Sequence, residues 1–156
     1  MGVPVIDLAD DLVTKLGTET SHSFERRVAP YFSKDDVEGG KWIVIPAGDT
    51  QDIRARKVDV STLTVDVGYQ ANLPDKTNAE PDPLNNTTWF DAEMQKLEDV
   101  KDLFRGEGSL RHEKFAPSSK FYFQAMTNTP IYRPDLMTDY QIFTAVIRLE
   151  FLGEIE

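Results

Sequence analysis

Apolar residues recur at helical spacing in two stretches of the chain. The first covers residues 5–16, where aspartates lie early, at the end that the helix dipole makes favourable for negative charge, and Gly17 supplies a stop. Its apolar stripe consists of Val5, Leu8, Ala9, Leu12, Val13 and Leu16. The pattern predicts an amphipathic helix that buries one face.

The second helical stretch begins near Thr88, which forms a variant capping box with Asp91. Its apolar stripe consists of Phe90, Met94, Leu97, Val100 and Phe104. Gly106 and Gly108 follow the stripe and predict the end of the helix. Gly106-Glu107-Gly108 therefore indicates a helix terminator, not a phosphate-binding loop.

Other stretches are short and apolar or alternate between apolar and polar residues, as β-strands do. The predicted strands cover residues 24–32, 41–46, 54–58, 62–70, 120–127 and 142–152. Pro30 cannot donate a ladder hydrogen bond, so residues 24–32 are expected to be an edge strand or an arm.

The segments between these strands predict turns and loops. Residues 35–40 and 130–135 are expected to be turns and residues 47–52 a loop, while three prolines make residues 71–87 a predicted long exposed loop. The order of elements predicts an α+β fold with a mostly antiparallel (mixed) β-sheet, two main helices packed on one face, a β-hairpin arm and that loop. A chain of 156 residues, 40% of them hydrophobic, fits one domain spanning 1–156.

The charge and the cysteine count exclude several kinds of chemistry. The chain has a formal net charge of −10 and no cysteine. Disulfides, thiolate metal sites and thiol catalysis are therefore ruled out. Because an acidic chain repels nucleic acid and anionic lipid at long range, neither is an expected partner. The first residues do not predict a signal peptide, and no apolar run is long enough to predict a membrane span.

Candidate catalytic residues are few. His22 and His112 lack further ligands at metal-binding spacing, so no metal or other cofactor is expected. Ser21-His22-Ser23 suggests a hydrolase only by adjacency, which is not how a catalytic triad is recognised. A nuclease hypothesis would use Asp82, Asp99 and Lys101, but helical geometry would keep the last two from converging. The chain is accordingly not expected to be an enzyme.

Basic residues cluster on two of the predicted strands: Arg26, Arg27, Arg54, Arg56 and Lys57. One interpretation is a solvated strand face. The other is a contact with an acidic partner or a neighbouring subunit, which the excess of 27 acidic residues makes plausible. Both interpretations remain open at this point.

The order of elements resembles that of the tail-terminator and head–tail joining (tail completion) proteins of long-tailed bacteriophages. The resemblance spans roughly residues 5–152 and rests on a pattern of strands and turns. Its main segments are KWIVIPAG from Lys41, VDVGYQANLP from Val65, EMQKLEDV from Glu93, PIYRPDL from Pro130 and FTAVIRLEF from Phe143.

The resemblance implies a virion structural protein of the tail or neck, assembled in the host cytoplasm. Such a protein forms a ring, commonly of six subunits, that caps the tail tube and offers a surface to the connector of the head. Its partners would be copies of itself, the tail tube protein and the neck proteins, and the genome would pass through the ring without specific binding. The alternatives are a neck adaptor, a minor tail protein, a protein-binding module unrelated to phages and an unrecognised enzyme.

Overall fold

The computed structural model describes residues 2–55, 58–74 and 82–155. Its α-helices are α1 (Pro4–Glu19), α2 (Thr87–Asp102) and α3 (Pro134–Tyr140), and its short 3-10 helices are η1 (Lys34–Val37) and η2 (Pro83–Asn85). The strands are β1 (Phe24–Arg26), β2 (Lys41–Ala55), β3 (Val58–Asn72), β4 (Phe121–Thr127) and β5 (Ile142–Ile155).

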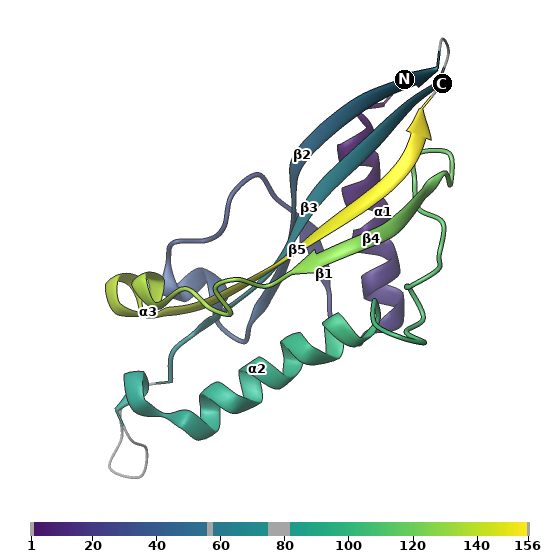
Figure 1. Cartoon of the computed structure of the whole chain (residues 1–156). Helices are drawn as coiled ribbons and strands as arrows, with labels where there is room; N and C mark the ends of the chain where they lie inside the picture. Colours follow the sequence, from purple (N-terminus) through teal and green to yellow (C-terminus); the bar gives the residue numbers. More distant parts are fainter. Residues whose placement is uncertain (1, 56–57, 75–81, 156) are drawn as a thin grey trace.

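The five strands form one open sheet in the order β1-β2-β3-β5-β4. β1 runs parallel to β2, and the other neighbouring strands are antiparallel. Figure 1 shows the long, twisted strands β2, β3 and β5 with α1 and α2 packed against the sheet. The predicted α+β class, with a mostly antiparallel mixed sheet, is confirmed.

The two long helices share one hydrophobic core with one face of the sheet. Both predicted stripes lie in this core, where Leu8, Leu12 and Leu16 come from α1 and Leu97 and Val100 from α2. The strands contribute alternate residues, namely Leu63, Val65, Val67, Tyr69, Ala71, Phe143, Ala145, Ile147, Leu149 and Phe151. The apolar residues that recur every 3.6 positions in the helices and every second position in the strands therefore face the same core.

The second strand is longer than the sequence indicates. The sequence predicts a strand, a loop and a strand over residues 41–46, 47–52 and 54–58, but Lys41–Ala55 is a single strand paired with β3. Its register shifts between Pro46 and Gly48, where a β-bulge takes up the extra residue. The proline and glycine that suggest a break thus mark a bulge inside one strand.

The expected strand at residues 24–32 is short. Its edge position is confirmed, but pairing ends at Arg26, and the chain then passes over the other face of the sheet. There the backbone N–H of Tyr31 donates to Oε1 of Gln70 (2.7 Å), and Nε2 of Gln70 donates back to the carbonyl of Tyr31 (2.9 Å). Gln70 is fully buried. Its two side-chain hydrogen bonds hold the backbone at Tyr31, where the sequence predicts a strand.

Three further local expectations are corrected. The loop predicted at 71–87 begins later, because Ala71 and Asn72 belong to β3 and the N–H of Leu73 donates to the carbonyl of Gln141 at 3.0 Å. Residues 75–81 of this segment lie outside the described residues. α2 is capped by Asn86, whose side chain accepts from Trp89 N at 3.1 Å, not by Thr88. The expected turn at 130–135 leads into a third helix, α3.

Candidate functional site

The face of the sheet opposite α1 and α2 is covered over only half of its length. Residues 27–37 and α3 meet over the covered half, where the rings of Phe32 and Tyr140 lie 5.7 Å apart. Nζ of Lys34 donates to Oε1 of Gln141 at 3.3 Å and joins η1 to the end of α3. Figure 1 shows these two segments side by side at one end of the molecule. Beneath them Gln70 and Thr144 are buried and hydrogen-bonded to each other at 3.1 Å.

The other half of this face is open in the described chain. Tyr122 of β4 and Leu152 of β5 are paired across the two strands, and their side chains are 44% and 39% exposed. Beside them lies a hollow of about 360 Å³ lined by Thr50, Asp52, Val60, Thr62, Gln124 and Leu152. A sheet with an uncovered, partly apolar face commonly packs against another layer or another molecule.

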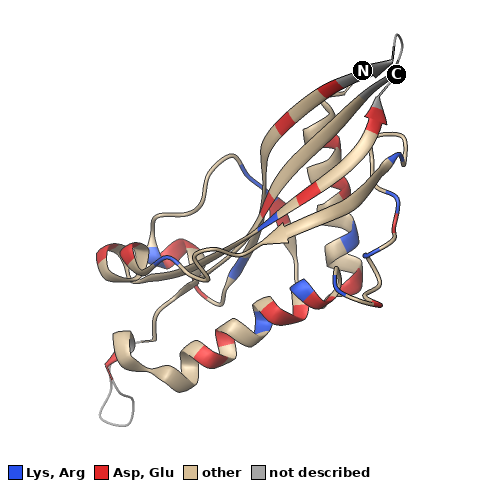
Figure 2. Cartoon of the chain, in the orientation of Figure 1, with Lys and Arg blue, Asp and Glu red and all other residues tan. Residues whose placement is uncertain are grey.

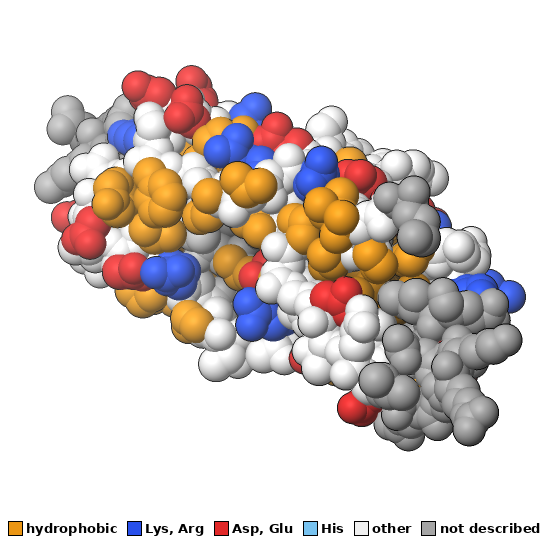
Figure 3. Space-filling model, turned by 90° about the horizontal axis from the view of Figure 1, so that it is seen from above, with side chains coloured by type: hydrophobic (Ala, Val, Ile, Leu, Met, Phe, Trp, Pro, Cys, Tyr) orange, Lys and Arg blue, Asp and Glu red, His pale blue; other side chains and the backbone are white. Residues whose placement is uncertain are grey.

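Charged residues divide the open half from the covered half. Arg148 of β5 donates two hydrogen bonds to the carboxylate of Asp66 on β3, at 2.8 and 3.1 Å, and this hydrogen bonding raises the pKa of Arg148. In the view of Figure 3, apolar side chains gather in a broken band across the surface, with charged side chains scattered along it. Apolar and charged side chains therefore lie close together on the side of the molecule seen in this view.

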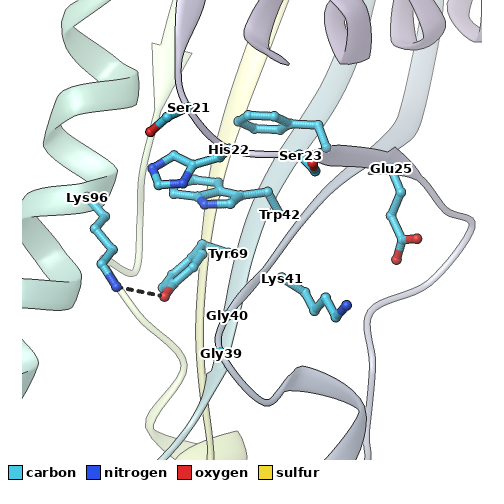
Figure 4. A pocket seen from close by; sticks show the side chains of 11 residues that line it. Ser21, His22, Ser23, Glu25, Gly39, Gly40, Lys41, Trp42, Tyr69 and Lys96 are labelled. Atoms are coloured by element: carbon cyan, nitrogen blue, oxygen red, sulfur yellow. Dashed lines mark hydrogen bonds between the residues drawn. The ribbon is translucent and has the colours of Figure 1, made fainter.

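A separate polar pocket of about 310 Å³ lies at the start of β1 and β2 (Figure 4). The ring of His22 stacks on Trp42, with 5.3 Å between centroids, and Tyr69 lies 4.5 Å from Trp42 on the other side. The remaining lining residues include Ser21, Ser23, Glu25, Gly39, Gly40, Lys41 and Lys96.

A buried hydrogen-bond network closes one side of this pocket. The hydroxyl of Tyr69 donates to Oε2 of Glu93, and Nζ of Lys96 lies 3.0 Å from Oε1 of Glu93 and 3.3 Å from the Tyr69 oxygen. Burial, followed by the hydrogen bond to Glu93, raises the pKa of Tyr69 well above its ordinary value. Because every member has a partner, the network fixes β3 to α2 and needs no ligand to satisfy it.

The residues considered for catalysis do not converge. Within the described residues, Ser21 and Ser23 make no side-chain hydrogen bond with His22, which stacks on Trp42. Asp82 accepts from Leu84 N at the start of η2, while Lys101 bonds to Glu98 and Asp99 to Gln95 along α2. His112 is exposed.

No group of three or more His, Cys, Asp or Glu side chains that could hold a metal ion occurs among the residues the structure describes. That the chain lacks enzymatic activity stays a prediction, because the absence of a recognised site is not a measurement of activity.

The predicted basic cluster is not one patch in the part that is described. Arg26 pairs with Asp10 of α1 at 2.8 Å. The Arg27 guanidinium lies 3.7 Å over the ring of Tyr31 and donates to the carbonyl of Ala29.

Arg54 lies on β2 ten residues beyond Val44, which is the partner of Arg26, and this separation corresponds to about 33 Å along the strand. Arg56 and Lys57 lie outside the described residues, as does the side chain of Arg54. The proposed contact to a partner through these five residues stays a prediction.

The open sheet face is not predicted from the sequence, although the alternation in 142–152 carries a signal for it. The inward positions are Phe143 to Phe151, taken alternately, so Leu152 falls among the outward residues, which include Thr144, Arg148 and Glu150. An apolar residue among polar ones on an outward face is ordinary. Its pairing with a second exposed apolar residue, Tyr122, depends on the strand order, which sequence patterns do not fix.

No protein-family model matches this chain, and a search of curated proteins gives no match. None of the described helices is long and apolar enough to cross a membrane. The assignment of a function therefore depends on the surface of the molecule and on the resemblance in the order of its elements.

Proposed function

We propose that the chain is a virion assembly protein, a tail terminator whose closed ring caps the tail tube of a long-tailed bacteriophage and joins the tail to the head. The observation that carries the assembly part of this proposal is the open half of the sheet. There Tyr122 and Leu152 present apolar surface beside a hollow, and no described element of the chain covers them. Neighbouring exposed apolar side chains beside a hollow favour a surface that contacts another protein.

The shape of the chain also supports assembly into a ring. β1 pairs with only the first part of β2, so the strand from Ile45 to Ala55 has no neighbour on that side among the described residues. Together with β4 at the other end of the strand order, this gives two different exposed edges. A ring is built from two unlike surfaces that meet head to tail, and a closed rotation completes it.

The charge of the chain fits a channel through which DNA passes. The net charge of −10 gives no general attraction to phosphate groups, so the genome could slide past without being held. Net charge alone does not distinguish a terminator from other acidic proteins. The phage assignment itself rests on the resemblance in the order and spacing of elements.

The decisive experiment measures the mass of the protein in solution by light scattering after size exclusion, over a range of protein and salt concentrations. Negative-stain images of the largest species accompany it. A closed ring of about six subunits with a central hole supports the proposal. A strict monomer at every concentration contradicts a ring that forms alone and favours a neck adaptor that assembles on its partner, or a protein-binding module.

A further inference from the structure

An exposed aromatic pair lies at the end of the molecule that carries α3. We propose that this end docks a basic segment of another protein, one in which Lys or Arg residues surround an apolar side chain. The partner is a protein other than a second copy of this chain, so the contact goes beyond the proposed ring.

The aromatic pair consists of Phe32, which lies just before η1, and Tyr140, the last residue of α3. Their rings meet edge to face with 5.7 Å between centroids, and the two residues are 54% and 46% exposed. Each ring therefore covers one side of the other and leaves the rest in solvent. Aromatic side chains are enriched in protein interfaces, where they supply the apolar centre.

The backbone that carries the pair is held in place from both sides. Nζ of Lys34 donates to Oε1 of Gln141 at 3.3 Å and joins η1 to the end of α3. Next to Phe32, the backbone of Tyr31 exchanges two hydrogen bonds with the buried side chain of Gln70. A surface that is ordered before binding loses little conformational entropy when a partner docks on it.

Acidic side chains border the two rings. Asp35 and Asp36 lie in η1, and Asp139 lies in α3 next to Tyr140. All three are exposed, and none forms an ion pair with a residue that the structure describes. Figure 2 shows acidic residues on both η1 and α3 at this end. The apolar centre therefore has an acidic rim.

The basic residues of the same region do not cancel this charge. Residues 32–37 and 133–141 contain four acidic residues and two basic ones, which leaves a net charge of −2. One of the two basic residues, Arg133, is already used, because its guanidinium donates twice to the carboxylate of Asp135. Basic groups of a partner would complement the charge that remains.

The carboxylates of this end suit a protein partner better than an ion or a phosphate. In the described part of the chain, no group of three or more His, Cys, Asp or Glu side chains could hold a metal ion. The rim carboxylates are therefore spread over a surface instead of converging on one point. Their negative charge repels the phosphate groups of nucleic acid and lipid.

A second copy of the chain does not offer the matching surface. Its exposed apolar pair, Tyr122 and Leu152, lies beside acidic residues, because Asp52 lines the adjacent hollow and Glu150 shares the face of Leu152. Many basic side chains are paired with carboxylates of the same copy, namely Lys15, Arg26, Lys96, Lys101, Arg105, Arg133 and Arg148. A different protein is therefore the expected partner.

The binding test uses a labelled peptide of sequence Lys-Lys-Leu-Phe-Lys-Lys and the full chain, with fluorescence anisotropy measured at low and at physiological salt. Two further peptides, Lys-Lys-Ser-Ser-Lys-Lys and Glu-Glu-Leu-Phe-Glu-Glu, are compared with it. We expect the first to bind, the second to bind more weakly because it lacks the apolar anchor, and the third not to bind. Equal binding of the first two would reduce the contact to general charge attraction and overturn the inference.

A change in the aromatic pair locates the site. Phe32→Ser should weaken binding of the first peptide by about tenfold, because it removes half of the apolar centre. Tyr122→Ser is the matched control, since it removes an exposed aromatic residue from the open sheet half and should change nothing. Melting temperatures of both variants verify that the chain is folded.

A change in the acidic rim provides the second measurement. The double variant Asp36→Asn, Asp139→Asn should weaken binding by about fivefold at low salt, and by less at physiological salt. The control Glu107→Gln, Glu113→Gln removes the same charge at exposed positions elsewhere and should have little effect. Equal losses in each variant and its control would overturn the inference, as would absence of binding by the first peptide. Neither result bears on whether the chain forms a ring.

Discussion

The hydroxyl of Tyr69 donates a hydrogen bond to the carboxylate of Glu93, and this contact ties the middle strand of the sheet to α2. Both residues are almost completely buried, with 2% and 6% of their surface exposed. Lys96, whose side chain is 40% exposed, reaches the same carboxylate from the solvent side. A buried carboxylate with two donors is stable only while both donors remain.

Removal of the Tyr69 hydroxyl should destabilise the fold. Tyr69→Phe leaves Glu93 buried with one donor fewer, which should lower the free energy of unfolding by about 2 kcal/mol. Urea unfolding followed by tryptophan fluorescence measures the loss. Tyr140→Phe is the matched control, because that tyrosine is exposed and should change the stability very little. Equal stability of the two variants would show that the hydrogen bond contributes nothing measurable.

The same residue should make stability depend on alkaline pH. Tyr69 has a pKa raised above the ordinary value of 10.0, so above pH 10 the unfolded chain loses a proton that the folded chain keeps. Its contribution is complete below that pH and decreases as pH rises, by about 1.4 kcal/mol per pH unit. Unfolding curves recorded from pH 8 to pH 11 measure the slope. Tyr69→Phe should show a shallower slope than the native chain, and parallel curves would contradict the assignment.

The two adjacent glycines before β2 should differ in their tolerance of a side chain. Both have positive φ, +78° at Gly39 and +87° at Gly40, but an added Cβ at Gly39 meets nothing within 4 Å, whereas at Gly40 it would lie 2.5 Å from the Tyr69 hydroxyl oxygen. Gly39→Ala should therefore cost about 1 kcal/mol through backbone strain alone. Gly40→Ala should cost a further 1–3 kcal/mol or so from the steric overlap. Thermal unfolding of both variants gives the difference, and equal losses would refute the overlap.

Ser61 offers a change that should stabilise the chain. Its side chain is fully buried, and its Oγ has no hydrogen-bond partner among the described residues. Ser61→Ala removes the unsatisfied hydroxyl and should raise the free energy of unfolding by about 1 kcal/mol. Ser23→Ala, at an exposed serine, serves as the control and should leave stability unchanged. A less stable Ser61→Ala protein would mean that the hydroxyl has a partner after all.

Sequence patterns predict the elements whose burial is one-sided and continuous. The stripe from Leu8 to Leu16 and the alternation from Phe143 to Phe151 each report one face packed on the shared core. Such patterns are local, so they can be read without knowledge of the rest of the chain. They also explain why the layer arrangement is predicted correctly, because each apolar face is buried only by packing against the others in one core.

The remaining features depend on residues far apart in the sequence. Gln70 and Tyr31, separated by 39 residues, hold the crossing segment in place, and nothing around either residue indicates the other. β2 is long because it stays paired with β3 on both sides of its bulge, and this pairing is not visible in the sequence of β2 alone. α3 is a helix of seven residues with only Leu136 and Met137 buried, too short for a periodic signal. The open sheet half follows from strand order alone and escapes prediction for the same reason.

The register of β3 against β5 also determines when the fold can form during synthesis. The paired residues are 70 positions apart at Asn72–Ile142 and 96 apart at Asp59–Ile155. While a ribosome makes the chain, β2 and β3 can form their hairpin early, but one edge of β3 stays without a partner until β5 has emerged. Until then, the nascent chain exposes that edge, together with the apolar side chains that β5 later helps to bury, and such species are prone to aggregate. Holdase chaperones that shield extended apolar segments should therefore raise the yield of this protein in the cell.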